Sequence, residues 1–466
     1  MAGVLPSNVS YFMQRMQGLS TSHFKVHPQT DGNQTSGKIV RFELPSNTLL
    51  NLRSTRLFFA AKTAGAGASM PNDVSSFIER CSVYMGGVLV QNGFQGYNVL
   101  KHAKAALKGS KCGSTLGHPE IVRKISYHNG ATFANTDPET YLEDGTESFC
   151  IDDWEGLLGT LEPSIIDTGL FPQITLEITL ADDTVCPISE GRVLPDGAGT
   201  STNHFDKTGS GNPTYVLSQM TLQVEVLGMA TSVLDQIVEQ RIASVGYLSM
   251  PFKNHYSFTS THNGTSRFNV NSASWDRLWL AYRPTNYSTK SAPVIVNGYK
   301  KAGAFVDDVA GQTAADIDLG KPQYDAGGVF DTNKEKYISN YFKFKEIESS
   351  SSVPAYFQLQ VNSANVPAYR MTTPEAYAMS MNSIDTYDKN HKLTLDQYRN
   401  NFFVQCYRFC LPDSDFNRLA SGLDSRSVSA MGSLTTENIG ACNLMMFAEC
   451  TAELRLGSGR AIEIIA

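Results

Sequence analysis

Short runs in which apolar and polar residues strictly alternate recur along this chain of 466 residues. Ile174–Leu180 reads Ile-Thr-Leu-Glu-Ile-Thr-Leu, and Met220–Leu227 follows the same two-residue period. Because successive side chains of a strand point to opposite faces, each run predicts a strand with one buried face. Turns and polar loops separate the runs, and helical patterns are brief. This organisation predicts an all-β sandwich or jelly roll.

The order of these patterns starts again in the second half. Arg41–Leu44 leads to Arg56–Ala60, and Arg267–Val270 later leads to Arg277–Ala281. A hairpin pattern and a short helix follow in both halves, and the final alternation, Thr451–Leu456, resembles the run that ends the first half. A chain of this length exceeds what one hydrophobic core supports. The repeated order of elements therefore predicts two related β-barrels in tandem, with short helices and long loops.

The predicted division has four parts. Ser232 and Asp235 resemble a capping box before a helical apolar stripe, which places the connection between the barrels there. The parts are an N-terminal arm at 1–34, a first jelly roll at 35–230, a connecting helix at 231–246 and a second jelly roll at 247–466. Each barrel carries one long polar loop, at 181–213 and at 286–335.

The predicted arm contains one amphipathic pattern. Val9, Phe12, Met13 and Met16 follow the spacing of one helix face. A helix this short is not stable alone, so its apolar face needs a partner. That partner is either the chain's own barrel or a neighbouring subunit, and the sequence favours neither.

Charge and hydropathy exclude several roles. The formal net charge is −7, and the densest basic stretch, Lys101–Lys111, holds only four lysines. A protein that coats DNA needs a concentrated positive surface, so neither genome packaging nor sequence-specific nucleic-acid binding is expected. No run of about 18 apolar residues occurs, and no secretory signal precedes the first strands. We therefore expect no transmembrane segment.

Motifs for catalysis or metal binding are missing from the sequence. The eight cysteines are scattered without a CxxC pair, which favours free thiols in a reducing compartment. There is no HExxH, Walker loop or GxSxG elbow, and the paired acidic residues lack the spacing of a calcium loop. We expect no catalytic residue, cofactor or metal. Glycosidase carboxylate pairs have no sequence signature, however, so a hydrolase on a β-scaffold stays an alternative.

Two segments carry a family resemblance. One runs from FELPSNTLLNLRSTRLFF at Phe42 through IERCSVYMGGVLVQNGFQGYNVLKHAKAAL to LGHPE at Leu116. The other is FCIDDWEGLLGTLEPSIIDTGLFPQITLEITLA, Phe149–Ala181. Together they resemble the first barrel of the major capsid proteins of Polinton-like viruses, relatives of virophages, adenoviruses and the large eukaryotic DNA viruses. The resemblance covers much of residues 40–230, and the second half agrees mainly in architecture.

The resemblance implies an all-β double jelly roll that assembles: two tandem eight-stranded jelly-roll β-barrels with short helices and long loops. Three copies would form a pseudo-hexagonal, hexon-like capsomer, and many capsomers would tile an icosahedral shell around double-stranded DNA, assembled inside the host cell. The implied partners are the chain itself, penton proteins and minor capsid proteins. On this interpretation the N-terminal arm points inward and ties capsomers together. Asp153, Trp154 and Glu155 are candidates for a trimer contact, although support of the loop within their own barrel is the favoured alternative.

A different virion β-sandwich protein is the main alternative to a major capsid protein. A fibre or lectin-like binding protein predicts a secretion signal or an exposed aromatic platform, and the sequence reveals neither. A minor capsid or vertex protein of related viruses is typically a single jelly roll. The second start of the pattern at Arg267 disfavours that alternative.

Overall fold

The computed structural model describes most of both halves of the chain. The described ranges are 20–30, 32–64, 74–108, 147–186, 214–228, 242–285, 353–384, 402–411, 421–426 and 430–465, with isolated residues and short pieces between them.

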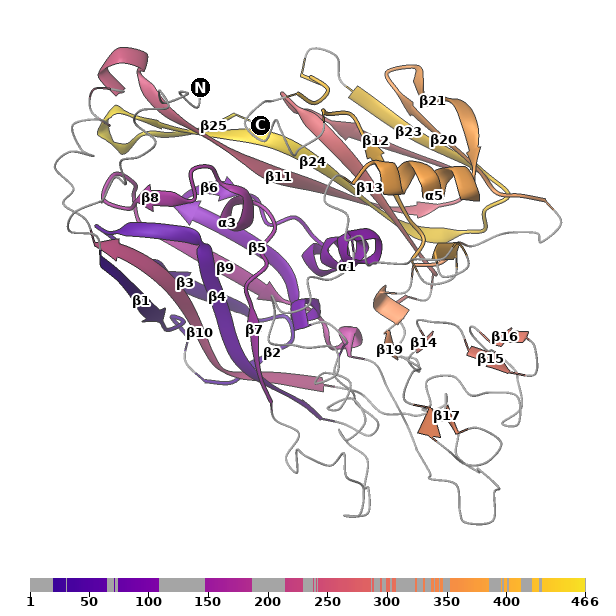
Figure 1. Ribbon diagram of the computed structural model, residues 1–466, viewed down its shortest axis with the longest axis horizontal. Coiled ribbons are helices and arrows are strands. Elements are labelled where there is room, and N and C mark those ends of the chain that lie inside the picture. The colour runs from indigo at the N-terminus through magenta and orange to yellow at the C-terminus, as the bar shows by residue number, and fades with distance from the viewer. Residues whose placement is uncertain are drawn as a thin grey trace, which may run out of the picture.

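The first half contains two antiparallel sheets (Figure 1). The strands are β1 (Ser20–Val26), β2 (Gln34–Thr35), β3 (Ile39–Glu43), β4 (Leu49–Ala64), β5 (Ile78–Met85), β6 (Val88–Gln91), β7 (Glu147–Ile151), β8 (Ile165–Asp167), β9 (Ile174–Leu180) and β10 (Thr214–Gly228). One sheet has the order β1-β10-β4-β7, with β2 paired to β10 and β8 to β4, and the other has the order β3-β9-β5-β6. The helices are η1 (Val74–Phe77), α1 (Tyr97–Lys108), α3 (Leu157–Thr160) and η2 (Asp183–Val185).

The second half repeats this construction. Its strands are β11 (Tyr247–His262), β12 (Thr265–Val270), β13 (Trp275–Arg283), β20 (Tyr356–Val361), β21 (Ala364–Thr372), β22 (Val404–Arg408), β23 (Ala430–Glu437), β24 (Cys442–Gly457) and β25 (Ile462–Ile465). The sheets have the orders β11-β24-β13-β22, with β25 paired to β24, and β12-β23-β20-β21. Helix α5 (Thr373–Asn382) follows β21, and η4 (Asn340–Phe342) and η5 (Ser458–Arg460) are short. Between β13 and η4 lie short strands: β14 (Val294–Ile295), β15 (Tyr299–Lys301), β16 (Ala304–Val306), β17 (Gln323–Tyr324), β18 (Phe330–Asp331) and β19 (Tyr337–Ile338).

The two halves share one topology. If β2, β8, β25 and the short strands are set aside, the described residues of each half form eight main strands. In both halves the first, eighth, third and sixth strands form one sheet, and the second, seventh, fourth and fifth form the other. This is the pairing of a jelly roll, so the prediction of two tandem eight-stranded jelly rolls is confirmed.

The alternating pattern explains where the core lies. In β9 the side chains of Ile174, Leu176, Ile178 and Leu180 are all buried, while the residues between them are partly exposed. Each such strand buries one face against the opposite sheet of its sandwich. The apolar residues of both sandwiches, together with α1, form one continuous core.

The predicted hairpins and helices occupy matching places in the two halves. Gly86 and Gly87 both have positive φ, which is the backbone of the tight turn joining β5 to β6. Asn362 and Ser363 adopt the same left-handed conformation between β20 and β21. A helix follows each hairpin, α1 in the first half and α5 in the second. The predicted order of a hairpin and then a short helix is therefore confirmed.

The N-terminal region differs from the expectation of an arm at 1–34. Residues 20–35 contain β1 and β2, which pair with β10 of the first barrel. The side chains of β1 are exposed except for a partly buried Val26, so the strand is held by backbone pairing and lacks an apolar period. Residues 1–19, with Val9, Phe12, Met13 and Met16, lie outside the described residues. So does most of the predicted loop at 181–213, from residue 187 onward.

Candidate assembly surfaces

Helix α1 lies between the two halves (Figure 1). It contacts β5 and η1 of its own half and β13 and β22 of the second half. The segment around α3 adds backbone contacts: Glu162 N donates to Pro251 O at 3.0 Å, and Lys253 N donates to Thr160 Oγ1 at 2.9 Å. The two jelly rolls are therefore joined directly through the outer face of one sheet of the second half.

A buried network of charged groups crosses this joint. Lys104 Nζ on α1 lies 2.6 Å from Glu155 Oε2 of the first half and 3.0 Å from Glu449 Oε2 of the second. Glu449 also accepts from Arg277 Nη1 at 3.0 Å and from Trp279 Nε1 at 3.2 Å. The side chains of Lys104, Arg277 and Glu449 are each less than a tenth exposed. Pairing and hydrogen bonding compensate the cost of burying these charges.

The electrostatics of the network centre on Glu449. Burial by itself raises the pKa of this carboxyl, but the Lys104 ammonium, the neighbouring His255 and the Arg277 guanidinium together outweigh burial and hold the pKa well below its usual range. His255 beside it behaves differently, because burial and the positive charge of Lys104 both lower the pKa of its imidazole. Nε2 of His255 lies 3.2 Å from Lys104 Nζ, within reach as an acceptor, and 3.5 Å from Glu449 Oε2. The ring is therefore neutral, and Glu449 carries the negative charge of the joint.

The buried neutral imidazole makes stability depend on pH. Because the folded-state pKa of His255 lies below its unfolded value, the unfolded chain binds a proton below about pH 6.5 that the folded chain excludes. The free energy of unfolding should fall as the pH drops below about 6.5, by at most about 1.4 kcal/mol per pH unit from this group. We expect His255→Gln to flatten that dependence in urea denaturation. His23→Gln, at an exposed position of β1, is the matched control. Equal slopes for His255→Gln and the unsubstituted chain would contradict the prediction.

The three candidates Asp153, Trp154 and Glu155 all contact groups of their own chain. Trp154 is buried and its Nε1 donates to Thr55 O at 2.9 Å. Glu155 joins the network through Lys104, and the Asp153 carboxylate accepts from Lys101 Nζ at 2.6 Å. The Asp153 side chain is 47% exposed, so of the three it is the most accessible to another molecule. A trimer contact at these residues stays a prediction. The sequence did not single out their partners on α1 or Glu449, because no local pattern links positions so far apart.

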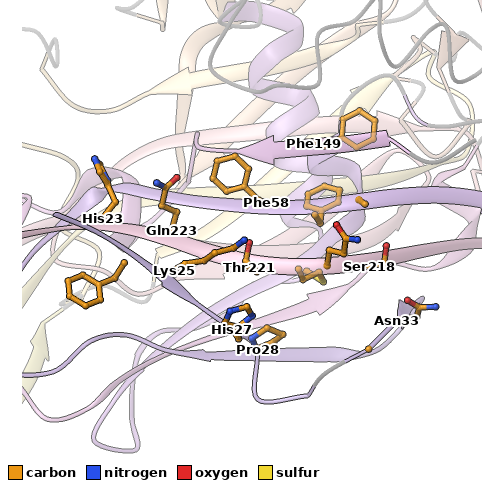
Figure 2. Close-up of a pocket in the computed structure, with 16 residues that line it drawn as sticks. His23, Lys25, His27, Pro28, Asn33, Phe58, Phe149, Ser218, Thr221 and Gln223 are labelled. Carbon is orange, nitrogen blue, oxygen red and sulfur yellow. The ribbon is translucent and has the colours of Figure 1, made fainter. Parts of the chain in front are cut away.

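A cavity of about 1010 Å³ opens on the outer side of the first-half sheet β1-β10-β4-β7. Figure 2 shows Lys25 from β1, Phe58 from β4, Phe149 from β7, and Thr221 and Gln223 from β10 along its wall. The register between β4 and β10 shifts beside the cavity, between Ser218 and Thr221. His23 and His27 also line it, so the cavity combines aromatic surface with basic and hydrogen-bonding groups.

The described part of the chain offers little chemistry beyond these surfaces. Within it, no group of three or more His, Cys, Asp or Glu side chains is placed to hold a metal ion. Seven of the eight cysteines lie in it, none of these seven forms a disulfide, and only Cys410 among them is not buried. None of the helices described there is long and apolar enough to cross a membrane.

Comparisons with known proteins agree on the fold. No family model matches the sequence, and no curated protein does. The solved structures include PBCV-1 VP54 fitted into a cryo-EM reconstruction of the virophage Sputnik, with a TM-score of 0.54, 10% identity and coverage of 98% of both chains. The Faustovirus major capsid protein has a TM-score of 0.53 at 9% identity, covering 95% of this chain and 91% of its own. A quasi-atomic model of the PBCV-1 virus capsid has a TM-score of 0.51 at 11% identity, and the alignment covers 97% of this chain and 98% of the chain in that model. The chain therefore has the double jelly-roll fold of these proteins over nearly its whole length.

Proposed function

We propose that this chain is a major capsid protein, the structural subunit of an icosahedral shell around a double-stranded DNA genome. The observation that carries the proposal is the shared fold: both jelly rolls align with the Faustovirus major capsid protein across 95% of this chain. The resemblance of the segment from Phe42 to LGHPE at Leu116, and of Phe149–Ala181, to Polinton-like major capsid proteins supports the same role. The chain then acts in the virion capsid, by assembling after synthesis in the host cell.

The proposed assembly unit is a homotrimer. Two halves with one topology give three copies six similar barrels, which suits a pseudo-hexagonal capsomer. Closing a ring with cyclic symmetry requires two unlike surfaces on each copy that fit one another. Penton and minor capsid proteins are the further proposed partners, and Val9, Phe12, Met13 and Met16 are the residues proposed to reach them.

The mass of the purified full-length chain in solution tests this function. Three chains of 51.0 kDa predict a particle of about 153 kDa by light scattering, with a hexagonal outline in negative stain. A folded 51.0 kDa monomer that persists at high concentration would contradict the capsomer and favour a monomeric binding protein or enzyme.

A further inference from the structure

The common topology allows the two halves to be aligned residue by residue. Arg56-Leu57-Phe58-Phe59-Ala60 in β4 corresponds to Arg277-Leu278-Trp279-Leu280-Ala281 in β13. Leu57 and Leu278 both point into the core of their sandwich, so Phe58 and Trp279 both lie on the outer face. The edge strands of the two sheets, β7 and β22, support this alignment. Phe58 pairs with Cys150 of β7, and Trp279 pairs with Cys406 of β22.

The register extends the correspondence to the other strands of these sheets. Gln223 pairs with Arg56 in the first half, and Glu449 pairs with Arg277 in the second. On the next strand, Lys25 pairs with Gln223, and His255 pairs with Glu449. The outer-face trio Phe58, Gln223 and Lys25 therefore corresponds to Trp279, Glu449 and His255.

These equivalent surfaces differ in what covers them. In the second half, Trp279, Glu449 and His255 are at most 5% exposed, because α1 of the first half lies over them. In the first half, Lys25 is exposed and Phe58 and Gln223 are only partly buried. They line the cavity of Figure 2, which is therefore the first-half counterpart of the surface that α1 covers.

The helix equivalent to α1 in the second half is α5. Both helices follow the fifth main strand of their half. Where it is described, α1 has no exposed residue, whereas Pro374, Glu375 and Ala378 of α5 are exposed. Among the described residues, α5 and the outer face of the sheet β1-β10-β4-β7 are thus only partly covered, in positions that match the joint between the two halves.

The charges of the two uncovered surfaces are complementary. Glu375 is the only charged residue of α5, and its exposed carboxylate is kept ionised by hydrogen bonds from Thr372, which lower its pKa. The cavity carries Lys25, with His23 and His27 nearby. At the joint within the chain the signs are reversed, since α1 brings Lys104 to Glu449. Opposite charges on these surfaces favour contact between copies and fix its register.

We propose that α5 of one copy docks into the cavity on β1, β10, β4 and β7 of a second copy, repeating the joint that α1 makes within the chain. This inference rests on the proposed trimer. Repeated three times, the contact is heterologous and closes a ring in which joints within a chain alternate with joints between chains.

Site-directed cross-linking tests the docking. The full-length variant Gln223→Cys with Ala378→Cys, treated with a short bismaleimide, should shift from 51.0 kDa to a covalent trimer of about 153 kDa on a denaturing gel. The control pair is Arg41→Cys with Ala378→Cys, because Arg41 is an exposed position on the other sheet of the same half. Each single variant measures the background from Cys410. If Gln223→Cys impairs folding, Lys25→Cys replaces it at an exposed site on the same cavity.

The outcomes separate the docking from the trimer. If light scattering shows that the purified chain is a monomer, the proposed function itself is contradicted. The docking is supported if the chain is a trimer and cross-links only when Ala378→Cys is combined with Gln223→Cys or with Lys25→Cys. A trimer that cross-links through Arg41, or through none of the pairs, overturns it. A Gln223→Cys thiol that is protected from maleimide but does not join Ala378→Cys also overturns it, and assigns the cavity to another occupant such as residues 1–19.

Discussion

Replacing Glu449 with glutamine should lower the free energy of unfolding by about 3–5 kcal/mol, because the change removes one partner of a buried ion network. Lys104 keeps Glu155, but Arg277 loses its carboxylate partner while it stays buried. Part of the loss reflects the weaker joint between the halves, since Lys104 and Glu449 come from opposite sides of it. Urea denaturation of the purified chain gives the difference directly.

A second ion pair provides the matched control for Glu449→Gln. Glu437 lies 2.6 Å from Arg370, but both side chains are at least half exposed. Exposed pairs contribute little, so Glu437→Gln should change stability by less than about 1 kcal/mol. If the two substitutions had equal effects, burial of the network at the joint would not be the source of its stability.

Replacing Trp279 with alanine should cost about 3–5 kcal/mol, the range for removing a large buried aromatic side chain. Trp279 is 1% exposed, its ring lies 5.7 Å from Lys104 Nζ, and its indole donates to Glu449. The substitution leaves a cavity at the joint and withdraws one hydrogen bond from a buried carboxylate. The loss should appear as a lower urea midpoint with an unchanged slope.

Phe58 supplies the control for Trp279, because it holds the corresponding position in the first half. It is only partly buried, so Phe58→Ala should cost an isolated chain about 1 kcal/mol. In the proposed trimer the same change should also weaken association, since the proposed contact covers Phe58. Equal losses for the two variants in the isolated chain would contradict the difference in burial on which the comparison depends.

The sequence predicted those strands whose two faces differ. β9 and β10 alternate, and both strands appear where the alternation predicts them. The second start at Arg267 also holds, because β12 and β13 occupy the places of β3 and β4. In each case, burial of a single face leaves a two-residue period that is visible without any knowledge of the fold.

Other features had no local signal. β1 is exposed on both faces and is recruited by backbone pairing with β10, so its side chains give no period. β13 is buried on both faces, yet it contains Asp276 and Arg277, whose partners Lys253 and Glu449 are distant in sequence. The network at the joint depends on positions 104, 155, 277 and 449, which only the folded chain brings together.

The place of β24 in the fold has a consequence for synthesis of the chain. Among the described residues β24 is the last main strand in the sequence, and it pairs with β11 along all 16 of its residues and also with β13. It also carries Glu449, the carboxylate that meets α1. A chain that stops before residue 442 leaves both neighbouring strand edges open and Lys104 without Glu449. Unpaired strand edges promote aggregation, and incompletely folded chains are degraded by proteases. Closing the second barrel and completing the joint between the halves therefore both depend on synthesis reaching β24.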